Sequence, residues 1–207
     1  TLLGCPKTGS LDLENPSDTY NEGVRVLQSA AGSGNVDYDK AYTMFTTSIG
    51  LDPTQAKAHY NAGWSAERMG FTDKAEQYYR QALNLDPNYS TALFNLGLVL
   101  TANNKGAEAA ELYKSYLDKN PEDIKVRNNL AEALAAAGQF DEAVENVRAI
   151  LRADNKNVGA YRALSRIYFA QGKLQMSQLC AEKAKTLAKG DSGIYNNIGV
   201  TYLVMND

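Results

Sequence analysis

The sequence repeats itself every 34 residues, and this period limits the folds that the chain can adopt. Small residues recur at one position of the period, in the series Gly63, Gly97, Ala131, Ser165 and Gly199. A second small series runs in step with the first, through Ala41, Ala75, Ala109, Ala143 and Ser177. Aromatic residues and prolines follow the same period before each series fades, at Phe45, Tyr79, Tyr113 and at Pro53, Pro87, Pro121. A fixed period of roughly 20–50 residues is typical of solenoids, in which similar units stack on one another.

Each period has the signals of two helices joined by a turn. In the second repeat, Asp52 is predicted to cap the first helix, with Pro53 at the first helical position. Gly70 is expected to end that helix in the left-handed conformation, and Thr72 to cap the second helix. The later repeats follow the same plan, with internal turns at 103–106 and at Gly138. The pattern therefore predicts an all-α chain of helix–turn–helix units.

A small residue in the first helix, an alanine opening the second, an aromatic residue four positions later and a closing proline resemble the tetratricopeptide repeat. The resemblance covers the chain from residue 18 onward. It implies a right-handed superhelical solenoid over 18–207, with about five full repeats and the first helix of a sixth at 194–206. The apolar stripe of that last helix favours a chain that continues beyond Asp207 over a terminal cap.

Residues 1–17 lack the repeat pattern and are interpreted as a leader. They contain Leu2-Leu3-Gly4-Cys5, which resembles the lipobox of bacterial lipoproteins. In that family a signal peptidase cuts before the cysteine, which becomes the acylated N-terminus, so the resemblance implies a lipid anchor on Cys5. Anchoring by lipid needs more than one acyl chain, and a lipoprotein cysteine supplies them. The alternative is a chance tetrapeptide.

Composition argues against several other classes of protein. The chain has 24 acidic and 21 basic residues, a balance that does not favour nucleic acid as a partner. No apolar run of about 18 residues could span a bilayer, and two cysteines with one histidine are too few for a cysteine–histidine metal cluster. His59 is expected at a helix-packing position, and Glu67, Asp141 and Glu142 on solvated faces. Without a nucleotide-binding loop or nucleophile elbow, we predict no enzyme, no cofactor and no small-molecule substrate.

The resemblance implies that the first helices of successive repeats line a concave groove. One groove position is asparagine in five of six repeats, with Ala163 the exception, in the series Asn21, Asn61, Asn95, Asn129 and Asn197. Where the family binds extended peptides, such a row pairs with the ligand backbone, and one amide supplies both a donor and an acceptor. The alternative is that asparagine is simply common at this position.

Side chains beside the asparagine row are predicted to set selectivity. Repeats 2 and 3 present the apolar set Tyr60, Trp64, Phe94 and Leu98, and repeats 4 and 5 present the polar set Lys125, Asn128, Glu132, Arg162 and Arg166. We therefore expect a ligand segment that is apolar over repeats 2–3 and acidic over repeats 4–5. The alternative for Trp64 is packing against the neighbouring repeat.

These observations predict an adaptor that binds other proteins in its groove. The combination of a lipobox and a repeat array resembles pilotin-like proteins of type IV pilus machines and repeat lipoproteins of myxobacterial gliding motility. That resemblance implies a lipid-anchored protein on the periplasmic side of the outer membrane. The alternative is a cytosolic regulatory or chaperone-like subunit that presents a partner enzyme. The residues before Thr1 distinguish the two, because a basic start and an apolar run mark an exported protein.

Overall fold

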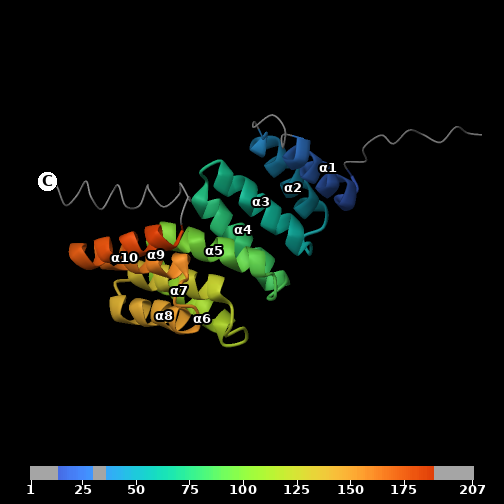
Figure 1. The fold of residues 1–207 in the computed structure, drawn as a ribbon. Helices are drawn as coiled ribbons and strands as arrows, with labels where there is room; N and C mark the ends of the chain where they lie inside the picture. Colours follow the sequence, from blue (N-terminus) through green and yellow to red (C-terminus); the bar gives the residue numbers. More distant parts are fainter. Residues whose placement is uncertain (1–13, 30–35, 189–207) are drawn as a thin grey trace, which may run out of the picture. The chain divides into compact units, whose positions relative to one another are not determined.

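The computed structural model describes residues 14–29 and 36–188, and the regular structure within these ranges is helical (Figure 1). The helices are α1 (Pro16–Ser29), α2 (Tyr38–Leu51), α3 (Ala56–Arg68), α4 (Thr72–Leu85), α5 (Ser90–Ala102), α6 (Gly106–Leu117), α7 (Ile124–Ala136), α8 (Phe140–Ala153), α9 (Val158–Ala170) and α10 (Leu174–Leu187). The all-α prediction is confirmed. Within these two ranges, none of the helices has the length and apolar character needed to cross a membrane.

The chain forms two compact units, residues 1–96 and 97–207. In the first unit α1 packs on α2, α2 on α3 and α3 on α4. In the second unit α6 packs on α7, α7 on α8, α8 on α9 and α9 on α10, and α7 also touches α9. Each unit is therefore a stack of helices that contact their neighbours in the chain. The lipobox-like segment and the predicted helix at 194–206 lie outside the described residues.

The small and aromatic series of the sequence are two sides of one helix contact. A Cβ atom on Gly23 would lie 2.7 Å from the ring of Phe45, and one on Gly63 would lie 2.9 Å from the ring of Tyr79. The first helix of a repeat thus needs a small residue where the aromatic side chain of the second helix crosses it. The alanine series is also buried at this crossing, because Ala41, Ala75, Ala109 and Ala143 are all fully inaccessible to solvent.

The turn between the two helices of a repeat uses the left-handed conformation, as predicted. Gly70 has φ +84°, Gly138 has φ +76° and Gly172 has φ +71°. Asn104 takes the same role in the third repeat with φ +61°. Asparagine tolerates this region better than other residues with a side chain, which explains why the third repeat can do without glycine.

The predicted start of the second repeat was wrong by several residues. Asp52 does not cap α3, which begins at Ala56. Its carboxylate instead accepts hydrogen bonds from the backbone N–H of Thr54 at 3.0 Å, the Thr54 hydroxyl at 2.7 Å and the Gln55 amide at 3.1 Å. These bonds, led by that of the Thr54 hydroxyl, hold the pKa of Asp52 below its usual value. Asp52 and Pro53 therefore form a turn ahead of the helix.

The predicted cap of the next helix was also misplaced. Thr72 is the first residue of α4, and the cap position belongs to Phe71, whose side chain makes no capping hydrogen bond. Side-chain caps do occur elsewhere. Asp123 accepts from the backbone of α7 and Asn157 from that of α9.

Candidate partner-binding faces

Helices α1 and α3 of the first unit line an open hollow of about 380 Å³, the α1–α3 pocket. It is lined from α1 by Tyr20, Val24, Leu27 and Gln28, and from α3 by Tyr60, Asn61 and Trp64. Most of this lining is aromatic or aliphatic, with polar groups supplied by tyrosine hydroxyls and two amides. Three of the predicted partner-binding residues, Tyr60, Asn61 and Trp64, therefore share one concave site.

Two of the predicted groove asparagines in the first unit, Asn61 and Asn95, are held by tyrosines of the array itself. The amide of Asn61 donates to the hydroxyl of Tyr20 at 3.1 Å. That of Asn95 lies 3.2 Å from the Tyr60 hydroxyl and 3.4 Å from the Tyr79 hydroxyl. The donor side of each amide is thus directed at the repeat before it. Burial raises the pKa of Tyr20 and Tyr60, so each hydroxyl that accepts from an asparagine keeps its own proton at neutral pH.

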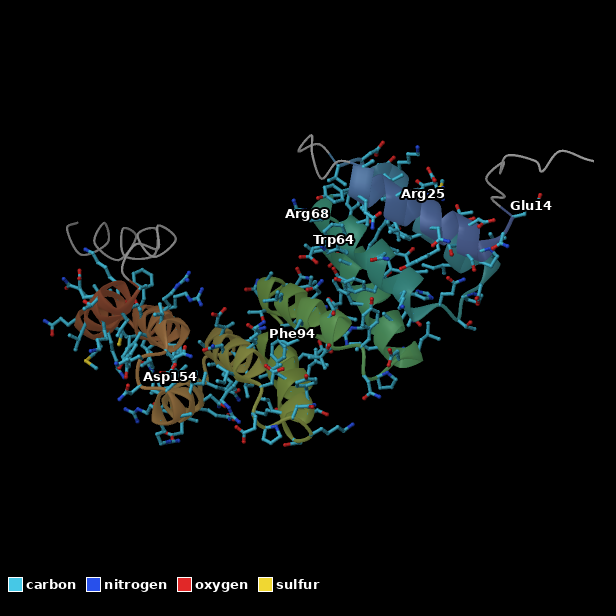
Figure 2. The ribbon with its side chains drawn as sticks, turned by 45° about the vertical axis from the view of Figure 1, so that its right-hand side comes forward. Glu14, Arg25, Trp64, Arg68, Phe94 and Asp154 are labelled. Carbon is cyan, nitrogen blue, oxygen red and sulfur yellow. The ribbon has the colours of Figure 1, made fainter. Side chains whose placement is uncertain are left out.

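Trp64 combines the two roles that the sequence left open. Its ring packs edge-on against Tyr38 of the preceding repeat, with ring centroids 5.5 Å apart and an interplanar angle of 76°. The same side chain lines the α1–α3 pocket and is only half-buried. Figure 2 shows Trp64 and Arg68 on the same part of α3. Arg68 was not among the predicted site residues, although its position one helical turn after Trp64 could have suggested it.

Helix α5 carries the two remaining apolar candidates. Phe94 is half-buried, and its neighbour Asn95 makes the tyrosine contacts described above. Leu98 is 48% exposed. A leucine this accessible in the middle of a helix is available to an incoming apolar side chain.

In the second unit the polar candidates lie on α7 and α9. Lys125 is exposed, whereas Asn128 and Arg162 are half-buried. The Oδ1 atom of Asn128 and the Nε atom of Arg162 are buried and have no hydrogen-bond partner among the described residues. Asn129 hydrogen-bonds to the side chain of Tyr113. The side chains of Asn128 and Arg162 are only half-buried, so their accessible polar atoms, rather than Oδ1 and Nε, can meet an incoming ligand.

Not every predicted cation of the second unit is free. Arg166 forms an ion pair with Glu132, one repeat away on the neighbouring inner helix. Asn197, the last predicted groove residue, lies outside the described residues. The basic character that the sequence predicted for repeats 4 and 5 therefore rests on Lys125 and Arg162.

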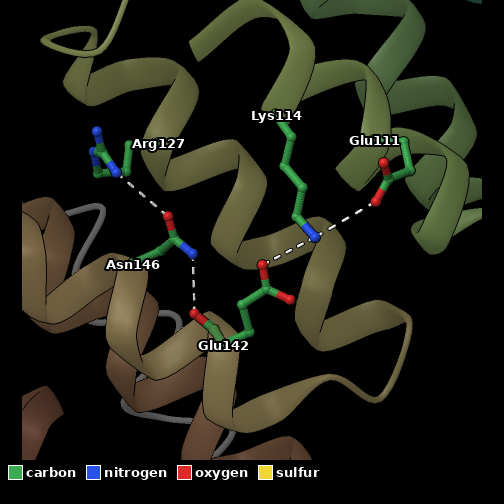
Figure 3. A network of polar contacts seen from close by, with 5 residues as sticks. All are labelled: Glu111, Lys114, Arg127, Glu142 and Asn146. Atoms are coloured by element: carbon green, nitrogen blue, oxygen red, sulfur yellow. Dashed lines mark hydrogen bonds and ion pairs between the residues drawn. The ribbon is translucent and has the colours of Figure 1, made fainter. Parts of the chain in front are cut away.

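Helices α6, α7 and α8 of the second unit carry a separate polar network (Figure 3). Lys114 lies 2.9 Å from Glu142 and 3.4 Å from Glu111. The amide of Asn146 donates to the backbone oxygen of Glu142 at 3.0 Å and accepts from Arg127 at 3.5 Å. The bond with Glu142 raises the pKa of Lys114. Lys114 is thus paired with carboxylates, which distinguishes it from Lys125 and Arg162.

Two further predictions from the sequence have clear outcomes. His59 is buried, as expected, with Nε2 2.9 Å from the backbone oxygen of Pro53. Asp141 and Glu142 are exposed, but the solvated position predicted for Glu67 was wrong. Glu67 is half-buried and accepts a hydrogen bond from the Tyr79 hydroxyl at 2.6 Å. Tyr79 fills the crossing between α3 and α4, and its hydroxyl reaches Glu67 on α3. The repeat pattern of the sequence does not reveal this contact.

Groups suited to metal or thiol chemistry are sparse in the described part of the chain. Within residues 14–29 and 36–188, no cluster of three His, Cys, Asp or Glu side chains could hold a metal ion. Cys180 is half-buried beside the buried Ala181 and Ala184, and burial raises the pKa of its thiol.

Stacked helical hairpins with a pocket and an asparagine row on their first helices define a helical-repeat protein of the kind that mediates protein–protein interactions. Sequence models of the tetratricopeptide repeat match residues 60–124, 100–164 and 134–176. These matches span more than half of the chain, which therefore belongs to the tetratricopeptide repeat family. No curated protein matches the sequence significantly.

Solved structures share the fold at low sequence identity. MamA, residues 41 to the end, from Desulfovibrio magneticus RS-1 has a TM-score of 0.71 and 16% identity, covering 88% of this chain and 99% of that one. YrrB, a TPR protein with an unusual peptide-binding site, has a TM-score of 0.67 and 20% identity over 87% and 90% of the two chains. PilW, a widely conserved type IV pilus biogenesis factor, has a TM-score of 0.66 and 19% identity over 89% and 86%.

Proposed function

We propose that the protein is an adaptor that binds extended segments of partner proteins on the inner faces of its repeats. The observation that carries this proposal is the α1–α3 pocket, where aromatic and aliphatic walls surround the tyrosine-held amide of Asn61. An apolar hollow with a few fixed polar groups suits a side chain flanked by peptide backbone. The peptide-binding site named for YrrB, which shares the fold, agrees with this role.

Different repeats are proposed to take protein segments of different chemistry. The pocket and the exposed Leu98 suit apolar side chains. Lys125 and Arg162 have no carboxylate partner among the described residues and suit an acidic stretch. Asn95 and Asn129 offer amide oxygens to backbone N–H groups while their donors stay with tyrosines.

Photo-crosslinking in the native cell tests which faces contact the partner. A photoreactive phenylalanine analogue at the exposed inner positions Gln28 and Lys125 should form adducts with the partner. The same analogue at Gln77 and Glu145, exposed on outer helices, is the matched control and should not. Adducts confined to Gln77 and Glu145 would place the interaction on the outer faces and disprove this proposal.

We further propose that the adaptor is lipid-anchored in a bacterial cell envelope through Cys5 and assists a motility or pilus machine. The lipobox-like Leu2-Leu3-Gly4-Cys5 supports the anchor, and the fold shared with the pilus factor PilW is compatible with the machine. In the native cell, Cys5→Ser should move the protein from the membrane to the soluble fraction, while Cys180→Ser should not. An unmodified Cys5 in the intact mass of the membrane-extracted protein would instead favour the cytosolic adaptor.

A further inference from the structure

Trp64 connects the apolar pocket to an arginine held in place by an aromatic ring. The guanidinium of Arg68 lies over the ring of Tyr38, 5.3 Å from its centroid, and its Nε donates to the Tyr38 hydroxyl at 3.2 Å. Trp64 packs edge-on against the same ring. Arg68 is therefore fixed one helical turn from a wall of the pocket, as Figure 2 shows for the two labelled side chains.

The held arginine has no carboxylate partner among the described residues. Its sequence neighbour Glu67 accepts the hydroxyl proton of Tyr79. The Tyr38 hydroxyl uses only Nε, and the side chain is exposed, so the two terminal nitrogens point their N–H groups to solvent or to a ligand. A guanidinium that is already oriented loses less conformational freedom when it pairs with a carboxylate, and the planar fork suits that group.

We propose that the α1–α3 pocket and Arg68 form one two-part site for a protein segment. The segment carries a large apolar or aromatic side chain for the pocket and, two residues away, an aspartate or glutamate for Arg68. Trp64 and Arg68 are four residues apart, about 6 Å along the helix axis. In an extended segment, side chains two residues apart lie on the same face at about 6.6 Å, so the two spacings match. This inference rests on the proposed function, because it requires an extended segment on the inner face of the first unit.

A second cation of the same unit provides the matched control. Lys74 lies over the rings of Phe71 and Tyr42, at 5.2 and 5.7 Å from their centroids. It is exposed and stacked on aromatic rings like Arg68, but it does not line the pocket. Lys74→Gln therefore removes one exposed, ring-stacked positive charge from the unit without changing the proposed site.

The experiment selects from a displayed library of random heptapeptides on the wild type and on Arg68→Gln, Lys74→Gln and Trp64→Ala, each checked for helical content. The wild type and Lys74→Gln should enrich peptides with an apolar residue two positions from an acidic one. Arg68→Gln should enrich apolar peptides without the acidic preference. Trp64→Ala should enrich few of these sequences.

An enriched peptide is then titrated by tryptophan fluorescence, because Trp64 is the only tryptophan of the chain. Changing the acidic residue of the peptide to its amide should weaken binding to the wild type about two- to fivefold at low salt, and leave binding to Arg68→Gln unchanged. The difference should shrink at high salt, because the pair is exposed.

The outcomes separate the two proposals. The two-part site would be overturned if the wild type enriched apolar peptides without an acidic preference. It would also be overturned if Lys74→Gln lost the acidic preference as Arg68→Gln does. In either case the inner face would remain the binding surface. Peptides that bind without changing the Trp64 fluorescence would overturn the two-part site as well. If no sequence is enriched on the wild type above Trp64→Ala, the first unit does not bind segments on its inner face, and both proposals fail there.

Discussion

At the scale of single residues, one contact between a small and an aromatic side chain recurs along the chain and changes its chemistry at the end. Gly23 faces Phe45, and Gly63 faces Tyr79. In the fifth repeat Ala181 stands at the aromatic position, and the small-residue and alanine positions of the crossing are Ser165 and Ser177. The hydroxyls of Ser165 and Ser177 lie 3.2 Å apart, and Ser177 also donates to the backbone oxygen of Ser165 at 2.8 Å. A crossing too close for large side chains can thus be sealed by a ring over glycine or by a hydrogen bond between small residues.

The closeness of this crossing can be tested at Ala109, which is fully buried in α6. Ala109→Leu should lower the free energy of unfolding by about 1–3 kcal/mol, because the added methyl groups have no space. Ala107→Leu, at an exposed position of the same helix, is the control and should change stability by less than about 0.5 kcal/mol. Denaturant unfolding followed by circular dichroism measures both. Equal stability of the two variants would show that the α6 crossing is not close-packed.

At the scale of elements, each hairpin is closed by one residue in the left-handed region. The first helix ends, that residue reverses the chain, and the second helix starts within a few positions, as at Gly70 between α3 and α4. The outermost carbonyls of the first helix are satisfied in this turn, because the N–H of Phe71 bonds to the oxygen of Ala66 at 2.9 Å. This is the hydrogen-bond pattern of a glycine helix terminus.

A pair of glycine variants separates the role of this turn from helix propensity. Gly138 has φ +76° and open space around a Cβ atom, so Gly138→Ala should destabilise by about 1–2 kcal/mol through backbone strain alone. Gly50 lies within α2, also with open space, so Gly50→Ala should stabilise by about 0.5–1 kcal/mol. The measurement is the midpoint of thermal or denaturant unfolding. A stabilising Gly138→Ala would contradict the left-handed turn.

At the scale of the whole molecule, both compact units bury tyrosines that must stay protonated. Burial is the main cause in each case. It raises the pKa of Tyr78 and of Tyr89 to about 12, and it raises the pKa of Tyr79 in the first unit and Tyr113 in the second further still. The hydroxyl of Tyr79 also donates to Glu67, which opposes its ionisation. These four tyrosines therefore make the fold sensitive to alkali.

The sign of this pH dependence follows from the direction of the shifts. A tyrosine in the unfolded chain ionises near its ordinary pKa of about 10, whereas these tyrosines lose their protons only at a higher pH in the folded protein. Their contribution to stability is fully present below pH 10 and is lost as the pH rises from about 10 through 12. Denaturant unfolding at pH 8, 10 and 11.5 should show this loss, and Tyr78→Phe/Tyr89→Phe should make it smaller. Stability independent of pH up to 11.5 would contradict the burial of these hydroxyls.

Most of the fold could be predicted from the sequence, because contacts in a stack of repeats are short-range. The small residue, the aromatic residue and the left-handed turn all belong to one hairpin, so their 34-residue period reports the packing directly. Helix starts were less predictable. Asp52 and Thr72 are residue types that often cap helices. Asp52, however, stabilises a turn before α3, and Thr72 is the first residue of α4. Local hydrogen bonds of Asp and Thr compete with helix capping, and composition alone does not decide between them.

The sequence alone determined the family and the repeat register, and it predicted that the first helices form the inner faces. Only the tertiary structure decided what those faces contain. Asn61 meets Tyr20 across a distance of 41 residues in the chain, and Arg68 meets Tyr38 across 30. The tertiary structure also pairs Arg166 with Glu132 in an ion pair, whereas the buried Nε of Arg162 has no hydrogen-bond partner among the described residues. The physical reason is that burial and backbone geometry recur with the period, whereas a side-chain hydrogen bond depends on the orientation of two specific groups on different helices.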